Sequence, residues 1–300
     1  MLLRMIASFA LLVACVDPAG STDSTAPVDD TGEEAVDPNA YLRGTAPLAT
    51  VSGGACPAME AGKVELVSNE LDRSVKLLIP ESGAEGKGVV FAWYPLGGSS
   101  SWLINALNLD AWVEDNDMVV VVPNASGGQA FEWSFTQNAE GNDDLALYDD
   151  VRTCLYEELG VDLGRVSSAG FSAGALWTSY LSLYRGDTLA TILPFSGGTD
   201  PVITYDTPAS DFPALLPYGG TSDTYGGNVV RFYETQANFA ASLTADGHFV
   251  VLCDHDLGHT IPPEGIDMMT AWLPAHTYGQ PSPFVGDISA LPDYCWVSEG

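Results

Sequence analysis

Residues 166–184 read VSSAGFSAGALWTSYLSLY, and a change of pattern within this stretch decides the fold. The first residues form a short run typical of a buried strand, and the last ones have the apolar repeat of a helix. Between them, Gly170-Phe171-Ser172-Ala173-Gly174 matches G-x-S-x-G. Five matching residues carry little weight alone, but the flanking strand and helix place Ser172 on a sharp strand-to-helix turn.

The alternation of strands and helices continues on both sides of this turn. The sequence predicts strands at 64–67, 75–79, 89–93, 118–122, 165–171, 191–195, 212–216 and 248–253, and helices at 143–159, 174–184, 229–245 and 266–273. Strands that alternate with helices pair in parallel, with helices on both faces of the sheet. Without an internal repeat or a Pro/Ser-rich linker, residues 41–300 are predicted to form one α/β domain with a mostly parallel, twisted sheet. The stretch after His276 is expected to wrap its surface.

A serine hydroxyl on such a turn is a candidate nucleophile, and it needs a base to remove its proton. Four histidines are available: His248, His255, His259 and His276. The first starts a predicted strand and the last ends a predicted helix, which leaves the loop after the last strand. We favour His259 there, because it lies further from the strand end and Gly258 permits close approach. His255 is the alternative.

An acidic residue between the serine and the histidine would complete the chain order Ser, Asp, His. Asp223 lies in the loop that leaves the predicted strand 212–216. A carboxylate there would accept the imidazole N–H and stabilise the imidazolium. Asp200 and Asp211 are alternatives, but both precede that strand.

Two backbone N–H groups are needed to stabilise an oxyanion. Ala173, directly after the candidate nucleophile, is expected to supply one. The loop after strand 89–93 is expected to supply the other. Pro95 has no N–H, so Leu96 is the preferred donor and Gly97 the second choice.

Short segments of the chain resemble secreted α/β-hydrolases of the polyhydroxybutyrate depolymerase and feruloyl or acetylxylan esterase type. They are Gly97-Gly98-Ser99, Asp149-Asp150-Val151, Arg165-Val166 with Gly170–Gly174, Gly220-Thr221-Ser222-Asp223, and Gly258-His259-Thr260-Ile261-Pro262. The resemblance covers residues 64–276 and implies an α/β-hydrolase fold, a Ser172–Asp223–His259 triad and hydrolysis of carboxylic esters without a metal or organic cofactor. The family usually has His-Gly where this chain has Tyr94-Pro95, a departure that bears on the oxyanion loop.

The bulky substrates of that family often need a cleft lined by aromatic side chains. Four tryptophans lie near the relevant loops: Trp93, Trp102, Trp133 and Trp177. We expect Trp93 in the core, and we take Trp133 and Trp177 as candidates for substrate contact.

The N-terminal residues have the features of an export signal. One arginine, a short apolar stretch and Leu12-Val13-Ala14-Cys15 resemble a bacterial lipoprotein signal, which predicts removal of residues 1–14 and lipidation of Cys15. An ordinary secretory signal is the alternative. Residues 15–40 contain seven Asp or Glu, no Lys or Arg, and many Ser, Thr, Pro and Gly, which predicts a disordered acidic linker. The protein is expected outside the cytoplasm, periplasmic or extracellular, on a membrane surface.

The remaining cysteines, Cys56, Cys154, Cys253 and Cys295, are even in number. In an oxidising compartment they predict two disulfides with three possible pairings, and a Cys56–Cys295 bond would join the two ends of the domain. None of their spacings is that of a zinc site. The ligands of a metal cluster around Asp254-His255-Asp256 and His259 would lie too densely in sequence for one ion.

The net charge of −30, from 10 basic and 40 acidic residues, argues against nucleic-acid binding and against electrostatic docking on anionic lipid. The expected partner is an ester substrate, polymeric or small, and the expected state is a monomer. Two other functions fit the same sequence. One is a non-catalytic binding lipoprotein, favoured by the Tyr94-Pro95 departure, and the other is a peptidase of the same fold.

Overall fold

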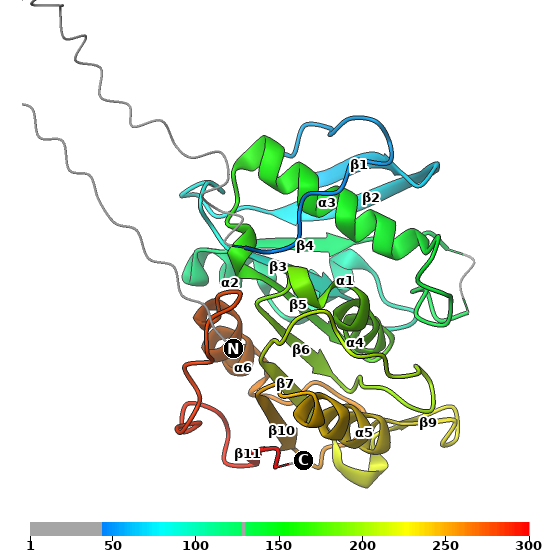
Figure 1. Cartoon of the computed structure of the whole chain (residues 1–300), viewed down its shortest axis with the longest axis vertical. Helices are drawn as coiled ribbons and strands as arrows, with labels where there is room; N and C mark the ends of the chain where they lie inside the picture. Colours follow the sequence, from blue (N-terminus) through cyan, green and yellow to red (C-terminus); the bar gives the residue numbers. More distant parts are fainter. Residues whose placement is uncertain (1–43, 128–129, 300) are drawn as a thin grey trace, which may run out of the picture. The chain divides into compact units, whose positions relative to one another are not determined.

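The computed structural model describes residues 44–127 and 130–299. Nine strands form one sheet in the order β1-β2-β4-β3-β5-β6-β7-β10-β11 (Figure 1). Their bounds are Gly62–Ser68 (β1), Leu71–Leu78 (β2), Val89–Trp93 (β3), Val119–Pro123 (β4), Val166–Phe171 (β5), Thr191–Phe195 (β6), Ala214–Tyr218 (β7), Val250–Asp254 (β10) and Cys295–Val297 (β11). The central strands from β4 to β10 run parallel, and β1, β2 and β11 are antiparallel to their neighbours.

Burial explains why the central strands have apolar runs instead of alternating patterns. Every residue of β3 and β4 is buried, as expected for parallel strands that are covered on both faces. By contrast, β1 at the edge of the sheet alternates buried and exposed residues. The predicted signal, the lipidation site Cys15 and the linker lie outside the described residues.

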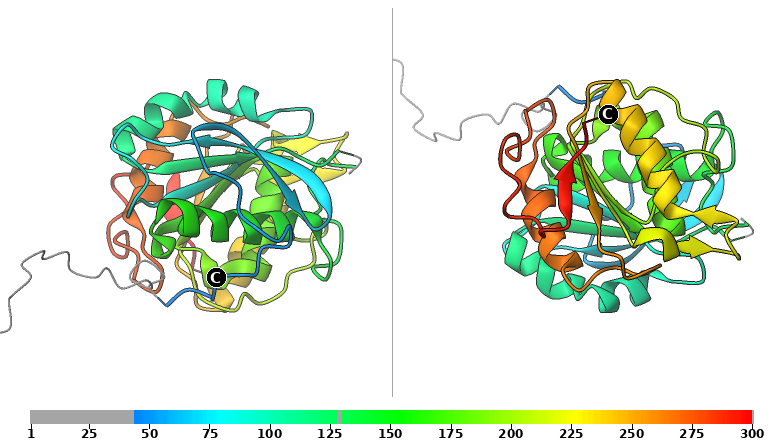
Figure 2. Two further views of the ribbon diagram at one scale, coloured as in Figure 1. Left: turned by 90° about the horizontal axis from the view of Figure 1, so that it is seen from above. Right: turned by 90° about the horizontal axis from the view of Figure 1, so that it is seen from below.

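Among the described residues, six α-helices cover the two faces of the sheet. They are Ser100–Ala106 (α1), Leu109–Asn116 (α2), Asp143–Leu159 (α3), Ala173–Arg185 (α4), Phe232–Ala245 (α5) and Gly265–Trp272 (α6). Figure 2 shows α1, α2 and α6 on one face and α3, α4 and α5 on the other. On the first face, the Trp112 indole N–H donates to Thr270 Oγ1 at 3.0 Å and joins α2 to α6.

All predicted strands and helices are present, with ends that differ by a few residues. The sequence pattern missed α1, α2, the small hairpin of Thr224–Tyr225 (β8) with Val230–Arg231 (β9), and β11. The first two are only seven and eight residues long and are separated by Asn108, whose φ is +47°. Helices this short show little periodicity.

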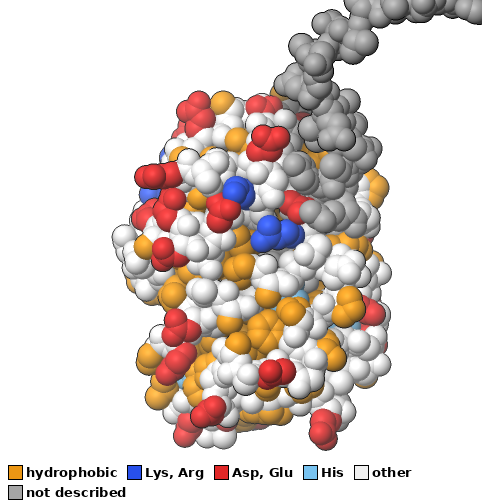
Figure 3. All heavy atoms as spheres, turned by 90° about the vertical axis from the view of Figure 1, so that its left-hand side faces the viewer, with side chains coloured by type: hydrophobic (Ala, Val, Ile, Leu, Met, Phe, Trp, Pro, Cys, Tyr) orange, Lys and Arg blue, Asp and Glu red, His pale blue; other side chains and the backbone are white. Residues whose placement is uncertain are grey.

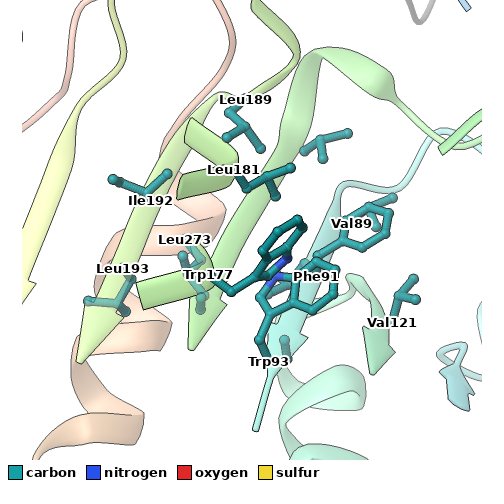
Figure 4. Packing of buried hydrophobic residues seen from close by; sticks show 14 of the residues in the cluster. Val89, Phe91, Trp93, Val121, Trp177, Leu181, Leu189, Ile192, Leu193 and Leu273 are labelled. Carbon is teal, nitrogen blue, oxygen red and sulfur yellow. The ribbon is translucent and has the colours of Figure 1, made fainter. Parts of the chain in front are cut away.

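An aromatic cluster fills the core between the central strands and α4 (Figure 4). Trp93 of β3 meets Trp177 of α4 edge to face, with 5.6 Å between ring centroids. The Trp93 indole N–H donates to Ser168 Oγ of the neighbouring strand β5 at 3.0 Å. The expectation that Trp93 is a core residue is confirmed, since its side chain is fully buried.

The two predicted disulfides are present as Cys56–Cys154 and Cys253–Cys295, so the possible Cys56–Cys295 bond does not form. The sheet order gives the physical reason. Cys56 precedes β1 and Cys295 lies on β11, and these strands form opposite edges of the sheet. Each disulfide therefore forms at one edge of the sheet. Cys154 lies on α3, which packs on β1, and Cys253 of β10 lies opposite Cys295 of β11 in the strand pair. Two disulfides are typical of an oxidising compartment outside the cytoplasm.

The C-terminal stretch does more than wrap the surface. After a loop it returns to the sheet as β11 and pairs antiparallel with β10. On the face shown in Figure 3, acidic side chains outnumber the basic ones. Within residues 44–127 and 130–299, none of the helices has the length and apolar character needed to span a bilayer.

His276 makes the stability of the protein depend on pH. Its ring is buried, Nδ1–H donates to the Trp272 carbonyl at 2.7 Å, and Nε2 accepts from Ser282 Oγ at 2.8 Å. Burial lowers the pKa of His276 to about 4, whereas the unfolded chain protonates near pH 6.5. The folded state therefore loses stability as the pH falls from the unfolded value to the folded one, by roughly 3 kcal/mol in total.

We expect His276→Gln to flatten this dependence in chemical unfolding experiments between pH 7 and 4. Some slope should remain, because burial also lowers the pKa of His248 and His255. An unchanged slope in His276→Gln would contradict the assignment.

Candidate active site

Ser172 lies on a strained turn between β5 and α4. Its φ of +57° and ψ of −119° are unusual for a residue with a side chain. The two motif glycines make this turn possible. A Cβ on Gly174 would lie 2.1 Å from the Trp93 carbonyl oxygen, and one on Gly170 would lie 2.3 Å from the Gly174 carbonyl oxygen. The close approach of β3, β5 and α4 therefore requires glycine at both positions.

The tertiary structure brings together the three side chains that the sequence singled out. His259 Nε2 lies 2.8 Å from Ser172 Oγ, and His259 Nδ1 lies 2.7 Å from Asp223 Oδ1. Since a carboxylate only accepts, Nδ1 carries the proton and Nε2 is free to accept the serine proton. The arrangement can therefore move a proton from Ser172 to His259, next to a carboxylate that stabilises the resulting cation.

Asp223 is held by groups other than the histidine. Its carboxylate is fully buried, and Oδ2 accepts hydrogen bonds from Ser196 Oγ at 2.8 Å and from the Gly219 N–H at 2.9 Å. These donors compensate the burial of a charge and fix the carboxylate plane. Ser196 was missed by sequence reasoning, although its position directly after β6 places it at the same sheet edge as Ser172.

The alternative site residues lie elsewhere. His255 is buried and its Nδ1 accepts from the Leu257 N–H at 3.2 Å, whereas Ser172 Oγ is bonded to His259. The Asp211 side chain is 76% exposed, beside His248. The Asp200 N–H donates to the Ile203 carbonyl, and the Asp200 carbonyl accepts from the Asn238 side chain, so both bonds tie Asp200 to segments other than the Ser172–His259 pair.

The His259 ring lies between two phenyl rings. It stacks on Phe232 with centroids 4.5 Å apart and on Phe171 with centroids 4.9 Å apart. The two faces of the imidazole are therefore covered, and its edge points to Ser172 on one side and Asp223 on the other. Phe171 is the variable residue before Ser172 in the motif, and Phe232 is the first residue of α5. Neither position indicates from the sequence that its ring stacks on His259.

The loop after β3 is a tight turn beside Ser172. The Gly98 N–H donates to the Pro95 carbonyl at 2.9 Å, and Gly97 has a φ of +74°, as the third residue of a type II turn requires. Pro95 is the first residue of this turn, so its ring leaves the turn intact. The Gly97 N–H, the second choice for an oxyanion donor, instead donates to Glu132 Oε1 at 3.0 Å. Leu96, the preferred donor, lines the same cavity as Ser172 and Ala173.

Trp133 and Trp177 are buried, so the expectation that they contact substrate is wrong. The Trp133 indole N–H donates to the Tyr94 carbonyl at 2.9 Å, and the Tyr94 hydroxyl accepts from the Ala125 N–H at 2.8 Å. Trp133 thus fixes the backbone at the start of the loop after β3 from the buried side. Trp177 belongs to the core cluster because α4 turns it toward Trp93. The tryptophan that does reach the site is Trp102, which is 44% exposed and lines a cavity with His259.

Glu132 is expected to orient the oxyanion loop through Gly97. Glu132→Ala would release the Gly97 N–H, and we expect kcat for p-nitrophenyl acetate to fall about 10-fold, less than the loss caused by removing an oxyanion donor itself. Glu132→Gln keeps an acceptor oxygen and should retain most of the activity. Equal kcat values for the wild type and Glu132→Ala would contradict this role.

Nothing in the described ranges, 44–127 and 130–299, brings three or more His, Cys, Asp or Glu side chains together in a way that could hold a metal ion.

The chain matches no family model and no curated protein sequence, but it resembles solved structures. Native sOPH has a TM-score of 0.66 at 19% identity, over 81% of this chain and 96% of that one. A ferulic acid esterase has a TM-score of 0.52 at 14% identity, over 67% and 91% of the two chains. An acetyl xylan esterase from Aspergillus awamori has a TM-score of 0.51 at 14% identity, over 70% and 98%. The chain therefore has the α/β-hydrolase fold.

Proposed function

We propose that this protein is a serine hydrolase that cleaves carboxylic esters through an acyl-enzyme. One observation carries the proposal: His259 bridges Ser172 Oγ and the buried Asp223 carboxylate at 2.8 and 2.7 Å. A hydroxyl in that position can be deprotonated as it attacks, which is the requirement for nucleophilic catalysis by serine. The similarity in fold to a ferulic acid esterase and an acetyl xylan esterase supports an ester as the substrate.

The proposed reaction has two halves. Ser172 Oγ attacks the ester carbonyl carbon as its proton passes to His259 Nε2, and the oxyanion accepts hydrogen bonds from the Ala173 and Leu96 N–H groups. The C–O bond to the alcohol then breaks, and His259 gives its proton to the departing oxygen. In the second half a water, deprotonated by His259, attacks the acyl-serine, and the proton returns to Ser172. Asp223 stabilises the imidazolium in both halves.

The proposed place of action is outside the cytoplasm. The signal at residues 1–14 and a lipidated Cys15 would tether the domain to a membrane surface through the acidic linker of residues 15–40. The two disulfides support an oxidising compartment.

A fluorophosphonate probe tests the function directly, because it phosphonylates only a serine that is activated as a nucleophile. We expect the purified protein to be labelled and the modified peptide to contain Ser172, and we expect heat-denatured protein to stay unlabelled. A folded protein that is never labelled would instead support a non-catalytic binding role on this scaffold.

A further inference from the structure

Two cavities border the Ser172–His259 pair. The acyl cavity, as we name it, is lined by Ser172, by both proposed oxyanion residues, and by the apolar side chains of Leu176, Val230 and Phe232. The alcohol cavity is lined by His259, Phe171, Trp102, Ile261, Pro262 and Ile266. The stacked rings of Phe232, His259 and Phe171 separate them, because Phe232 borders the first and Phe171 the second.

The chemistry of the reaction assigns a different half of the ester to each cavity. The carbonyl oxygen must point to the Ala173 and Leu96 N–H groups, which belong to residues of the acyl cavity. The departing oxygen must receive its proton from His259 Nε2, so the alcohol half must lie on the histidine side. The acyl chain then extends from the carbonyl carbon away from His259, toward Leu176 and Val230.

The two cavities differ strongly in size. The acyl cavity has a volume of about 20 Å³ and the alcohol cavity about 360 Å³. The space beside Ser172 is thus smaller than the space beside His259 by about an order of magnitude, which favours a short acyl group such as acetyl. The alcohol cavity has the volume of an ordinary small-molecule site.

The lining of the alcohol cavity indicates the character of the alcohol. Apart from His259, the polar groups of its side chains are the Thr260 hydroxyl and the Trp102 indole N–H, and the other side chains are aliphatic, proline or phenyl groups. A sugar would lose the hydration of several hydroxyls there and find few side-chain donors or acceptors in exchange. The half-exposed Trp102 offers an apolar face at the open end of the cavity.

We propose that the preferred substrates are acetate esters of bulky apolar or aromatic alcohols. This inference rests on the proposed esterase function and adds the substrate class. It makes Val230 a determinant of acyl length and Trp102 a determinant of the alcohol.

The acyl half is tested with p-nitrophenyl acetate, butyrate and octanoate. We expect kcat/KM to fall by about 50-fold or more from acetate to octanoate, because methylene groups that do not fit an apolar pocket lower kcat/KM by this order. Val230→Ala enlarges the cavity and should raise the butyrate-to-acetate ratio of kcat/KM about 10-fold by the same reasoning. Val202 lines the acyl cavity from another segment, so Val202→Ala provides the same test if Val230→Ala does not fold.

The alcohol half is tested with 1-naphthyl acetate, ethyl acetate and xylose tetraacetate. We expect kcat/KM to be highest for the naphthyl ester, and Trp102→Ala to reduce the naphthyl-to-ethyl ratio about 10-fold, the loss expected for removing an apolar contact. Trp296→Ala is the matched control, because Trp296 is 43% exposed on β11 and lines neither cavity. It should leave the ratio unchanged.

The possible failures are distinguishable. Faster hydrolysis of the octanoate than of the acetate would overturn the acyl assignment, and faster hydrolysis of the sugar acetate than of the naphthyl ester would overturn the alcohol assignment. In both cases fluorophosphonate labelling of Ser172 would show that the serine hydrolase function stands. Absence of both labelling and ester hydrolysis would overturn the proposed function, and the substrate class with it.

Discussion

Replacement of Ser172 by alanine is expected to lower kcat for p-nitrophenyl acetate by about 10⁶-fold, the order of loss seen when the serine of a Ser-His-Asp triad is removed. In the proposed mechanism this hydroxyl forms the acyl-enzyme. Its side-chain hydrogen-bond partner is His259 Nε2, and because the His259 side chain is 23% exposed, water can take the place of the hydroxyl in the variant. Initial rates measure the loss, and thermal unfolding should show that the variant stays folded.

Ser126→Ala is the control for this prediction. Ser126 is exposed in the loop after β4, and its hydroxyl donates to the neighbouring Gly127 carbonyl at 3.5 Å. The control should keep wild-type kcat. If Ser172→Ala retained more than a small fraction of the activity while folded, the nucleophile would have to be another residue.

Asp223→Asn is expected to lower kcat about 10⁴-fold, because the wrong tautomer of His259 becomes the stable one. The hydrogen bonds around the carboxylate explain why. The Gly219 N–H can only donate, and it lies 2.9 Å from Oδ2. An asparagine must therefore keep its oxygen on that side and turn its NH₂ toward His259 Nδ1. The histidine then carries its proton on Nε2 and can no longer accept one from Ser172.

Comparison of Asp223→Asn with Asp211→Asn separates this effect from a loss of negative charge. The Asp211 side chain is 76% exposed and lies away from the site, so its variant should retain full activity. The pattern is measured as kcat with a short p-nitrophenyl ester, together with the fluorophosphonate labelling rate. An Asp223→Asn variant within 10-fold of the wild type would contradict the proposed role of the carboxylate.

The expected positions of Ser172, Asp223 and His259 follow from local patterns. A parallel sheet brings the loops at the carboxyl ends of its strands to one edge, so residues that directly follow predicted strands must lie near each other. Ser172 directly follows β5, and Asp223 and His259 lie in the loops after β7 and β10, five residues beyond each strand end. Their presence at one edge of the sheet could be anticipated without knowledge of the packing, whereas the choice of His259 over His255 depends on the loop.

The features that the sequence left open, missed or predicted wrongly concern side chains whose surroundings come from other parts of the chain. Trp133 also follows a strand, but its side chain turns inward. There its indole N–H donates to the Tyr94 carbonyl and its ring packs against Trp93. The disulfides depend on which strands form the sheet edges, and the sequence did not reveal that Cys154 of α3 lies over the β1 edge. Ser196 and Glu132 act on the site through bonds that span 27 and 35 residues of the chain.

The sequence alone determined the strand–turn–helix around Ser172, the alternation of strands and helices, and the residues proposed for proton transfer. Each of these depends on periodicity or on turn chemistry within a few residues. The tertiary structure decided the disulfide pairing, the inward turn of Trp133 and Trp177, the stacking of His259 between two phenyl rings and the unequal cavities beside it. Those features depend on which distant segments share the space around a side chain, and contacts between distant segments leave no periodic signal in the chain.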